Sequence, residues 1–559
     1  MMLKFLHHIS LAALLHKRGR TSFFETHLPP PLFNWGIKGT FMHMIMMLLL
    51  LTAWLVPDKA NAIDRHEGFE VLIKGAVMEF AYVNRTAKTV ELACANLPAD
   101  SIVVIPSSVE YEGVTYRVTT IANTSYSVSL LKGAKKITIE EGIEKLGTDF
   151  CRINIAQSLR IPSTIKEIPA DAFQDITIDT IIWDTKEEVT IGDYAFRRAK
   201  FNHFVLPENT TEIGSGAFAE SNIKSVTLPK GFKNMAATNY VNPFFDCQEL
   251  VEIKSESPNY EVIDGVLYTS TGLTLICYPA SKKESTFNMP SSVTRIAQKA
   301  FYRCNNLTTV NFNENCMSIE KEAFYNCINL ATVNFNDHLN RIDASSFQYC
   351  RMLKSVALGR DCEFVRDYAF ANSGITSVIL NKNLRTIGTR AFARCSELSS
   401  VTVDGYDASN SALNSAGRKL IVLPKKLRYL GDEVFVKEYE NTVERPKESW
   451  LIALRADYLD YFGGQRGDTV FIYGNGTPKL AITGYAVKTL ALYIPFDQYD
   501  YYNALYKENE RSRPLKIVEY APIFFNNTIV TENNYKNIVW NGMSDGASAS
   551  YDIASKTLN

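Results

Sequence analysis

Histidine is scarce in this sequence, and no cysteines are spaced as paired metal ligands. Five of the eight histidines lie at or before residue 43, and the other three, His66, His203 and His338, are far apart. No Cys-x-x-Cys pair occurs among the ten cysteines. A zinc site needs such ligands close together, and a Ser-His-Asp triad needs a histidine beside its nucleophile. The sequence therefore predicts no metal site and no catalysis by histidine.

Net charge is almost absent, and so are the usual motifs of phosphate-binding and glycoside-cleaving enzymes. Lys and Arg total 59 against 60 Asp and Glu, so no global field attracts nucleic acid or an anionic membrane. No Gly-rich loop ends in Lys-Ser or Lys-Thr, and no repeated carboxylate pair is present of the kind that a glycosidase uses. We expect no catalytic residues, no cofactor and no nucleic-acid partner.

An apolar run at residues 44–56 is too short for a membrane span. Its thirteen residues fit the core of a signal peptide and fall short of the about 20 that cross a bilayer. Pro57 follows it, and Ala60-Asn61-Ala62 supplies the small-x-small pattern of a cleavage site. A buried core helix is the alternative. The run predicts cleavage near Ala62 and a secreted or cell-surface protein, with no membrane span after the signal is removed.

A small residue followed by phenylalanine recurs every 22 or 23 residues within each of two series. The phenylalanines of these pairs are Phe173, Phe196, Phe218, Phe301, Phe324, Phe347, Phe370 and Phe392. An alternating Leu-x-x-Val-x-Phe/Leu segment follows many of them, as in Leu307-x-x-Val310-x-Phe312, which predicts a short strand ending in a turn. So short a unit cannot enclose a core, so consecutive units must stack with parallel strands, one rung from each repeat.

Three further phenylalanines extend the two series, one at the regular spacing and two at longer spacings. Phe150 precedes Phe173 by 23 residues, and Phe244 follows Phe218 by 26. The 57 residues from Phe244 to Phe301 equal one repeat plus an insertion of 34, and the 43 residues from Phe392 to Phe435 equal one repeat plus about twenty. We place these insertions at about residues 251–288 and 403–420.

The repeat resembles that of the BspA-like leucine-rich-repeat proteins, which are surface and secreted proteins of anaerobic host-associated bacteria. The stretch MPSSVTRIAQKAFYRCNNL at residues 289–307 carries the resemblance, which extends over roughly residues 100–520. It implies an α+β repeat solenoid with parallel β rungs on one face and short helices or turns on the other. It also implies a hairpin insertion at 259–279, a β entry at 105–121 and a closing rung at 492–519.

These patterns divide the chain into five parts. We expect an N-terminal extension with the signal peptide at 1–62, an N-terminal β cap at 63–125 and the solenoid at 126–435. C-terminal rungs or a cap follow at 436–520, and a tail at 521–559.

The cysteines follow the repeat. Five stand three residues after an anchoring phenylalanine: Cys247, Cys304, Cys327, Cys350 and Cys395. Other repeats place Ala199, Ser221 and Ser373 in this column, so the position requires a small buried side chain. The pattern favours structural thiols over disulfides or metal ligation.

Alternation along the predicted strands identifies a candidate ligand face. If Leu307, Val310 and Phe312 point inward, Thr309 and Asn311 point outward. The repeat projects these two positions onto later turns, where Ala357 and Ile379 occupy two of them. The other positions hold short polar residues: Thr309, Asn311, Thr332, Asn334, Ser355, Ser377, Ser400 and Thr402. An alternative interpretation is that these are ordinary surface residues of strands, since threonine is a good strand former.

A binding or adhesion protein without enzymatic activity is the function that these features favour, because a stacked sheet offers a long continuous surface. The resemblance implies a host extracellular-matrix or bacterial surface protein as partner. Carbohydrate binding or, less favoured, carbohydrate processing is the alternative, based on the tyrosine-rich stretch 499–502. Arg466-Gly467-Asp468 matches the integrin-binding tripeptide, but so short a match is weak evidence and a linker between two strands is the favoured explanation.

Overall fold

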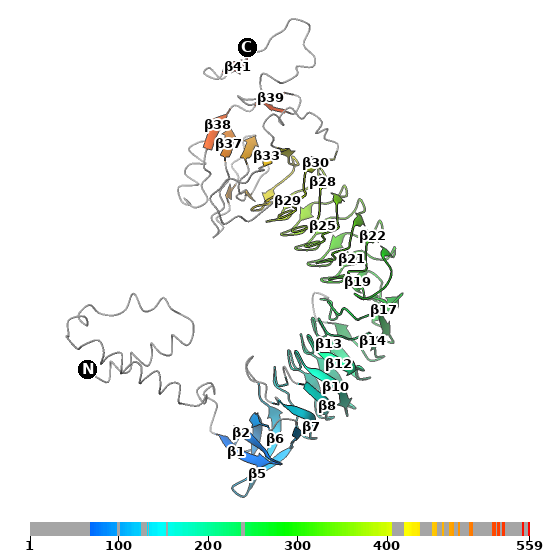
Figure 1. Cartoon of the computed structure of the whole chain (residues 1–559), viewed down its shortest axis with the longest axis vertical. Coiled ribbons are helices and arrows are strands. Elements are labelled where there is room, and N and C mark those ends of the chain that lie inside the picture. Colours follow the sequence, from blue (N-terminus) through cyan, green and yellow to red (C-terminus); the bar gives the residue numbers. More distant parts are fainter. Residues whose placement is uncertain are drawn as a thin grey trace, which may run out of the picture. The chain divides into compact units, whose positions relative to one another are not determined.

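The computed structural model describes residues 68–436, except 98–100, 124–130, 132, 152–154, 236–240 and 405–418, and isolated strands between 450 and 558. The chain divides into two units, Met1–His66 and Glu67–Asn559, and all described residues belong to the second. The predicted signal segment and its cleavage site lie outside the described residues. The described part of the chain consists of strands and turns (Figure 1). None of it forms an apolar helix of membrane-spanning length.

A five-stranded sheet forms the start of the second unit. Its strands, in spatial order, are β1 (Gly68–Ile73), β2 (Ala76–Asn84), β3 (Thr89–Asn96), β6 (Val114–Ile121) and β5 (Ser108–Tyr111). The rings of Phe69 in β1 and Tyr111 in β5 stack with centroids 4.3 Å apart, so an aromatic contact links the two edge strands. The strands β5 and β6 lie in the segment where the sequence predicted a β entry.

The Leu-x-x-Val-x-Phe/Leu segments form long strands that pair in parallel from one turn to the next, as predicted (Figure 1). In spatial order they form five groups: β4 (Ser101–Ile105), β7 (Ala134–Ile139), β8 (Ile155–Ile161), β10 (Thr177–Trp183) and β12 (Lys200–His203); β14 (Ser225–Leu228) and β16 (Glu252–Ser255); β20 (Thr286–Asn288), β22 (Thr309–Asn311) and β24 (Thr332–Asn334); β26 (Ser355–Ala357), β28 (Ser377–Leu380) and β30 (Ser400–Val403); β31 (Lys419–Val422), β33 (Trp450–Arg455), β35 (Thr469–Tyr473), β37 (Ala491–Pro495) and β38 (Ile517–Tyr520).

A second, short strand in most repeats corrects the expectation of one rung per repeat. These short strands form two further parallel series: β9 (Glu167–Ile168), β11 (Val189–Ile191), β13 (Thr210–Ile213) and β15 (Asn234–Met235); β21 (Arg295–Ile296), β23 (Ser318–Ile319), β25 (Arg341–Ile342), β27 (Phe364–Val365), β29 (Thr386–Ile387), β32 (Tyr429–Leu430), β34 (Tyr461–Phe462) and β36 (Lys479–Leu480). The expected α component is not found, since turns and short strands, with no helix, lie opposite the long strands of the described repeats.

The predicted hairpin insertion is present as β17 (Tyr260–Ile263) and β18 (Val266–Thr269), which pair antiparallel. Strand β19 (Thr274–Cys277) continues from this hairpin and pairs in parallel with β21. The hairpin therefore starts the second series of short strands. Two further antiparallel pairs follow near the end of the chain: β39 (Ile523–Phe525) with β40 (Thr528–Val530), and β41 (Tyr551–Asp552) with β42 (Thr557–Leu558).

The third side of each turn is a tight bend around the anchoring phenylalanine. Residues two before and two after the ring adopt positive φ, as in Glu322 (57°) and Asn326 (57°) around Phe324. Such angles cost free energy in residues other than glycine. Each of these amides donates to the next turn, Glu322 to the Ala344 carbonyl at 2.9 Å and Asn326 to that of Gln348 at 2.8 Å. Hydrogen bonding between repeats therefore holds a backbone that an isolated repeat would not adopt.

The anchoring rings form a column through the core. Ring centroids in consecutive turns lie 4.5–5.7 Å apart from Phe150 to Phe244 and from Tyr278 to Phe435. Tyr278 was not predicted as an anchor, yet it stacks on Phe301 at 5.0 Å and its amide donates to the Ala300 carbonyl. The 34-residue insertion thus contributes its own ring to the column.

Substituting one ring of this column should be costly. We expect Phe324→Ala to lower the free energy of unfolding by about 3–5 kcal/mol, because Phe324 is fully buried and stacks on both neighbours. The matched control is Phe364→Ala in β27, whose ring is partly exposed. Urea denaturation of the two variants measures the difference, and equal destabilisation would contradict the assigned register.

Candidate ligand face

The predicted outward residues lie on one face of the long strands. Their inward neighbours Val310, Val356, Val378 and Val401 are buried, while the predicted residues themselves are exposed or half-buried. We call the surface formed by these residues the hydroxyl face: Thr309, Asn311, Thr332, Asn334, Ser355, Ser377, Ser400 and Thr402. The predicted orientation of these side chains is confirmed.

The register across this face follows the repeat within two groups of strands. Thr309 lies opposite Thr332 and Asn311 opposite Asn334, and Ser377 pairs with both Ser355 and Ser400. No backbone pairing joins β24 to β26 in the described structure. The hydroxyl face therefore consists of two paired groups, where the sequence predicted one continuous ladder.

Hydroxyl groups on this face have no partner among the residues that the structure describes, which distinguishes them from hydroxyls one position earlier. Thr308, Thr376 and Ser399 each donate to a backbone carbonyl of the preceding turn at 2.9–3.1 Å. Among the described residues, no side chain or backbone group hydrogen-bonds to the hydroxyls of the face: Thr309, Thr332, Ser355, Ser377, Ser400 and Thr402. Each hydroxyl can therefore both donate to and accept from an external molecule.

The asparagines of the face form a ladder that the sequence did not predict. The Asn311 amide donates to the side-chain oxygen of Asn288 at 2.6 Å, and Asn334 donates likewise to Asn311 at 2.6 Å. Asn288 stands 23 residues before Asn311, so the repeat period could have identified it. These bonds fix the amide planes and use one donor and one acceptor of Asn311.

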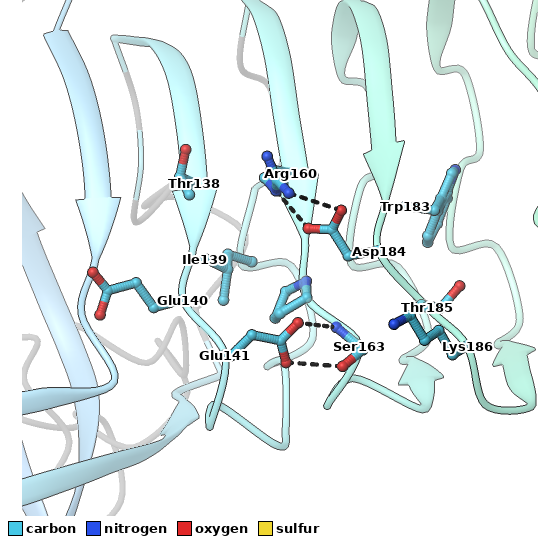
Figure 2. Close-up of a pocket in the computed structure, with 11 residues that line it drawn as sticks. Thr138, Ile139, Glu140, Glu141, Arg160, Ser163, Trp183, Asp184, Thr185 and Lys186 are labelled. Atoms are coloured by element: carbon cyan, nitrogen blue, oxygen red, sulfur yellow. Dashed lines mark hydrogen bonds and ion pairs between the residues drawn. The ribbon is translucent and has the colours of Figure 1, made fainter.

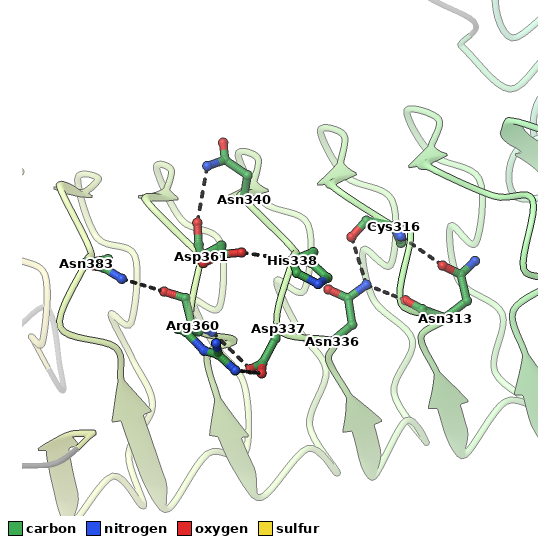
Figure 3. A network of polar contacts seen from close by, with 9 residues as sticks. All are labelled: Asn313, Cys316, Asn336, Asp337, His338, Asn340, Arg360, Asp361 and Asn383. Atoms are coloured by element: carbon green, nitrogen blue, oxygen red, sulfur yellow. Dashed lines mark hydrogen bonds and ion pairs between the residues drawn. The ribbon is translucent and has the colours of Figure 1, made fainter.

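A second polar network crosses the repeats just after the carboxyl ends of the long strands. Figure 3 shows Asn336 between two turns, with its amide donating to the Cys316 carbonyl at 2.9 Å and also to that of Asn313. Further along, Asn383 donates to the Arg360 carbonyl at 3.0 Å. These amides bond backbone carbonyls that would otherwise be unsatisfied, so we assign them a structural role.

Charged residues occupy the short-strand side of the same repeats. Glu320 lies between Arg295 at 3.1 Å and Arg341 at 2.9 Å, and Arg385 pairs with Glu363 at 3.3 Å. The charges on this side are therefore paired with one another, whereas the two outward columns of the hydroxyl face carry no charge.

The cysteine column hydrogen-bonds to the ring column. The thiols of Cys247, Cys304, Cys327, Cys350 and Cys395 each donate to the carbonyl of the preceding turn's ring residue at 2.9–3.6 Å. Ser373 occupies the same column and donates to the Phe347 carbonyl at 2.8 Å. All ten cysteines are free thiols in the structure. The column therefore accommodates a small side chain, and where that side chain is cysteine or Ser373 it also donates a hydrogen bond to the preceding turn.

Burial makes these thiols poor nucleophiles. It raises the pKa of Cys247, Cys327 and Cys395 to about 12, so they stay protonated at neutral pH, whereas reactive cysteines have a lowered pKa. Within the described part of the chain, no group of three His, Cys, Asp or Glu side chains could hold a metal ion. His203 ends β12 and His338 pairs with Asp361 at 2.9 Å, so these two histidines are not brought together.

Two other predicted features lie outside the described residues. These are the tripeptide Arg466-Gly467-Asp468 and the tyrosine-rich stretch 499–502.

Comparison with known proteins identifies the repeat. The model of the BspA type leucine rich repeat region matches residues 119–251 and 277–399, with six copies. The repeat region belongs to the BspA-type leucine-rich repeat family. The resemblance seen in the sequence is therefore confirmed. No curated protein matches the chain closely enough to count as a relative.

Several solved structures are similar to this chain. A leucine-rich cell surface protein from Faecalibacterium prausnitzii is 22% identical, covering 61% of this chain and 96% of its own, with a TM-score of 0.46. A leucine-rich repeat protein from Eubacterium ventriosum is 18% identical, with coverages of 68% and 99% and a TM-score of 0.43. The pneumococcal vaccine antigen PcpA is 17% identical, with coverages of 82% and 100% and a TM-score of 0.43.

The thiol column predicts a loss of stability at alkaline pH. Cys327 ionises near its ordinary pKa of about 8.5 when the chain is unfolded but has a pKa of about 12 when folded. The unfolded state therefore loses its proton first as the pH rises, and the free energy of unfolding falls by about 1.4 kcal/mol per pH unit for each such thiol. Cys327→Ser should make this decline shallower, because serine does not ionise in this range.

Urea unfolding at several pH values between about 8 and 10 measures the slope. Cys94→Ser, at an exposed position, serves as the control and should change the slope less. An unchanged slope for Cys327→Ser would show that the thiol is not buried as described.

Proposed function

We propose that this protein is an exported, non-enzymatic binding or adhesion protein that recognises a partner protein through the hydroxyl face. The observation that carries this proposal is the set of six hydroxyls without protein partners, held at strand spacing on an uncharged surface. Polar groups without protein partners are available to a ligand, whereas the paired charges of the short-strand side are already satisfied. The repeat family supports protein binding as well.

The spacing of the face suits an extended polypeptide. Neighbouring parallel strands lie about 4.8 Å apart, so equivalent hydroxyls recur at that interval along the face. The hydroxyl and amide side chains of the face are short and neutral. Recognition therefore depends on hydrogen bonds and shape rather than on long-range charge attraction. We expect a host extracellular-matrix protein or a bacterial surface protein as the partner, with binding that depends little on salt.

The partner class can be established by a direct screen. Purified full-length chain is applied to an array of host extracellular-matrix proteins and to a glycan array, and the release of reducing sugars is assayed in parallel. Saturable binding to a matrix protein without sugar release supports the proposal. Sugar release, or binding to glycans alone, would refute it.

Obstruction of the hydroxyl face should abolish binding of the matrix protein found in the screen. Arginine at Thr309, Thr332 and Ser355 removes three of the six unpartnered hydroxyls and places three long cations on the face, while the inward valines that hold the strands remain. We expect a loss of at least about tenfold in affinity, measured by surface plasmon resonance, with an unchanged melting temperature.

The matched control adds the same three charges elsewhere. Leu273, Met317 and Met352 are exposed and lie outside the long strands, so arginine at these positions should leave the affinity unchanged. If both triple variants bind as tightly as the wild-type chain, the hydroxyl face is not the recognition surface.

Export is a separate part of the proposal. Expressed with its first 62 residues in a bacterium with a general secretory pathway, the chain should be recovered outside the cytoplasm with Ile63 at its N-terminus. Intact-mass analysis of the secreted protein gives the cleavage site. Retention of residues 44–56 in the mature protein would contradict the signal-peptide assignment.

A further inference from the structure

A hollow of about 620 Å³ lies at the carboxyl ends of β7, β8 and β10, far from the hydroxyl face in sequence. Figure 2 shows its lining, in which Trp183 ends β10 and the segments after each strand contribute Glu141, Ser163 and Asp184. The volume falls within the about 300–1,000 Å³ typical of small-molecule sites. No motif in the sequence predicted a site here.

Trp183 is an exception in an otherwise aliphatic column. It lies opposite Ile161 in the register of β8 and β10, and Ile161 and Ile139 are both buried. Trp183 packs partly against the core and stays partly exposed. The structure explains this exposure, because β12 pairs with β10 only as far as Thr180. The last residues of β10 have no neighbouring strand on that side, so the indole ring borders the hollow.

The polar groups of the hollow are fixed in orientation. The Glu141 carboxylate accepts hydrogen bonds from the Ser163 amide at 2.9 Å and hydroxyl at 3.0 Å. The Asp184 carboxylate accepts from Arg160 Nε at 2.5 Å and Nη2 at 3.0 Å (Figure 2). A carboxylate has about four acceptor positions, so each retains capacity for a ligand. Groups held in this way bind with a smaller entropy cost than free side chains.

The indole N–H of Trp183 has a different environment from the rest of its ring. It is shielded from solvent and has no hydrogen-bond partner among the described residues. Burial of a donor without an acceptor costs free energy. The rest of the indole ring is partly exposed and offers an apolar surface to a ligand.

We propose that this hollow binds a neutral saccharide. A pyranose ring presents an apolar C–H face, which can pack on the indole, and hydroxyls that donate to the carboxylates and accept from Arg160. The acidic groups Glu140, Glu141 and Asp184 are offset by Arg160 and Lys186, so the hollow does not carry the strong charge of one sign that a charged polymer requires. The site is independent of the hydroxyl face and of the partner protein proposed for it.

Ligand-observed saturation-transfer NMR on the full chain tests the proposal. The probes are methyl β-glucopyranoside, methyl β-galactopyranoside, N-acetylglucosamine, cellobiose and lactose. We expect at least one of them to receive saturation, strongest on the C–H protons of one ring face. Trp183→Ala should weaken binding of that sugar at least about tenfold, whereas Trp183→Phe should retain part of the affinity because the ring remains.

Two aspartates form a matched pair that separates binding from folding: Asp179 within β10, and Asp184 directly after it. Asp184→Asn removes a charge that faces the hollow and should weaken sugar binding. Asp179→Asn removes a charge within β10 that accepts a hydrogen bond from Asn202 of β12, and it should leave sugar binding unchanged. Both variants are checked by melting temperature. The triple arginine variant of the hydroxyl face should bind the sugar normally, so failure of either proposal can be told from failure of the other.

Three results would overturn the saccharide assignment. The first is the absence of saturation transfer to all five sugars. The second is binding of the sugar by the folded Asp184→Asn and Trp183→Phe variants with wild-type affinity. The third is binding of N-acetyl-lysine methylamide in place of the sugars, which would show that the indole and carboxylates select a cationic side chain.

Discussion

Each turn of the solenoid completes its backbone hydrogen bonds on the following turn, and the rest of the structure depends on this constraint. The bend around Phe324 places Glu322 and Asn326 at positive φ, a conformation that local sequence does not favour. Amides on these residues donate to Ala344 and Gln348 of the next repeat. Because a single repeat cannot satisfy these groups, stability arises from the interfaces between repeats.

The same constraint explains which side chains recur. Stacking of consecutive turns places equivalent residues in contact. The phenylalanines therefore stack ring on ring, and each thiol of the cysteine column donates to the carbonyl of the ring residue in the preceding turn, as Cys327 does to Phe301. Serine replaces cysteine at Ser373 because it keeps the donor. Asparagines in the turns, such as Asn336, bond carbonyls of the preceding repeat. The regular spacing of the cysteines is thus a consequence of stacking.

The periodic part of the structure could be predicted from the sequence, and its exceptions could not. Spacing of the Ala-Phe pairs gave the turns, and alternation gave the outward position of Thr309 and its equivalents. Tyr278 was not predicted because it is a tyrosine that follows a cysteine, rather than a phenylalanine that follows alanine or serine, and because the insertion obscures its spacing. The short strands, two residues long at Arg295–Ile296, are too brief for alternation to identify. The unpaired end of β10 depends on where its neighbour stops, which no local pattern contains.

This distinction also indicates where binding sites arise in such a repeat. A regular turn uses its backbone groups and most polar side chains on its neighbours, so only side chains pointing away from the sheet remain available, as on the hydroxyl face. A hollow forms where one strand outlasts the next, as β10 does beyond Thr180. There the inward column reaches solvent, and a position that holds isoleucine in the two preceding strands holds Trp183. Regular turns therefore present nearly the same groups along the solenoid, whereas a departure from the repeat presents a local combination of groups that the other turns lack.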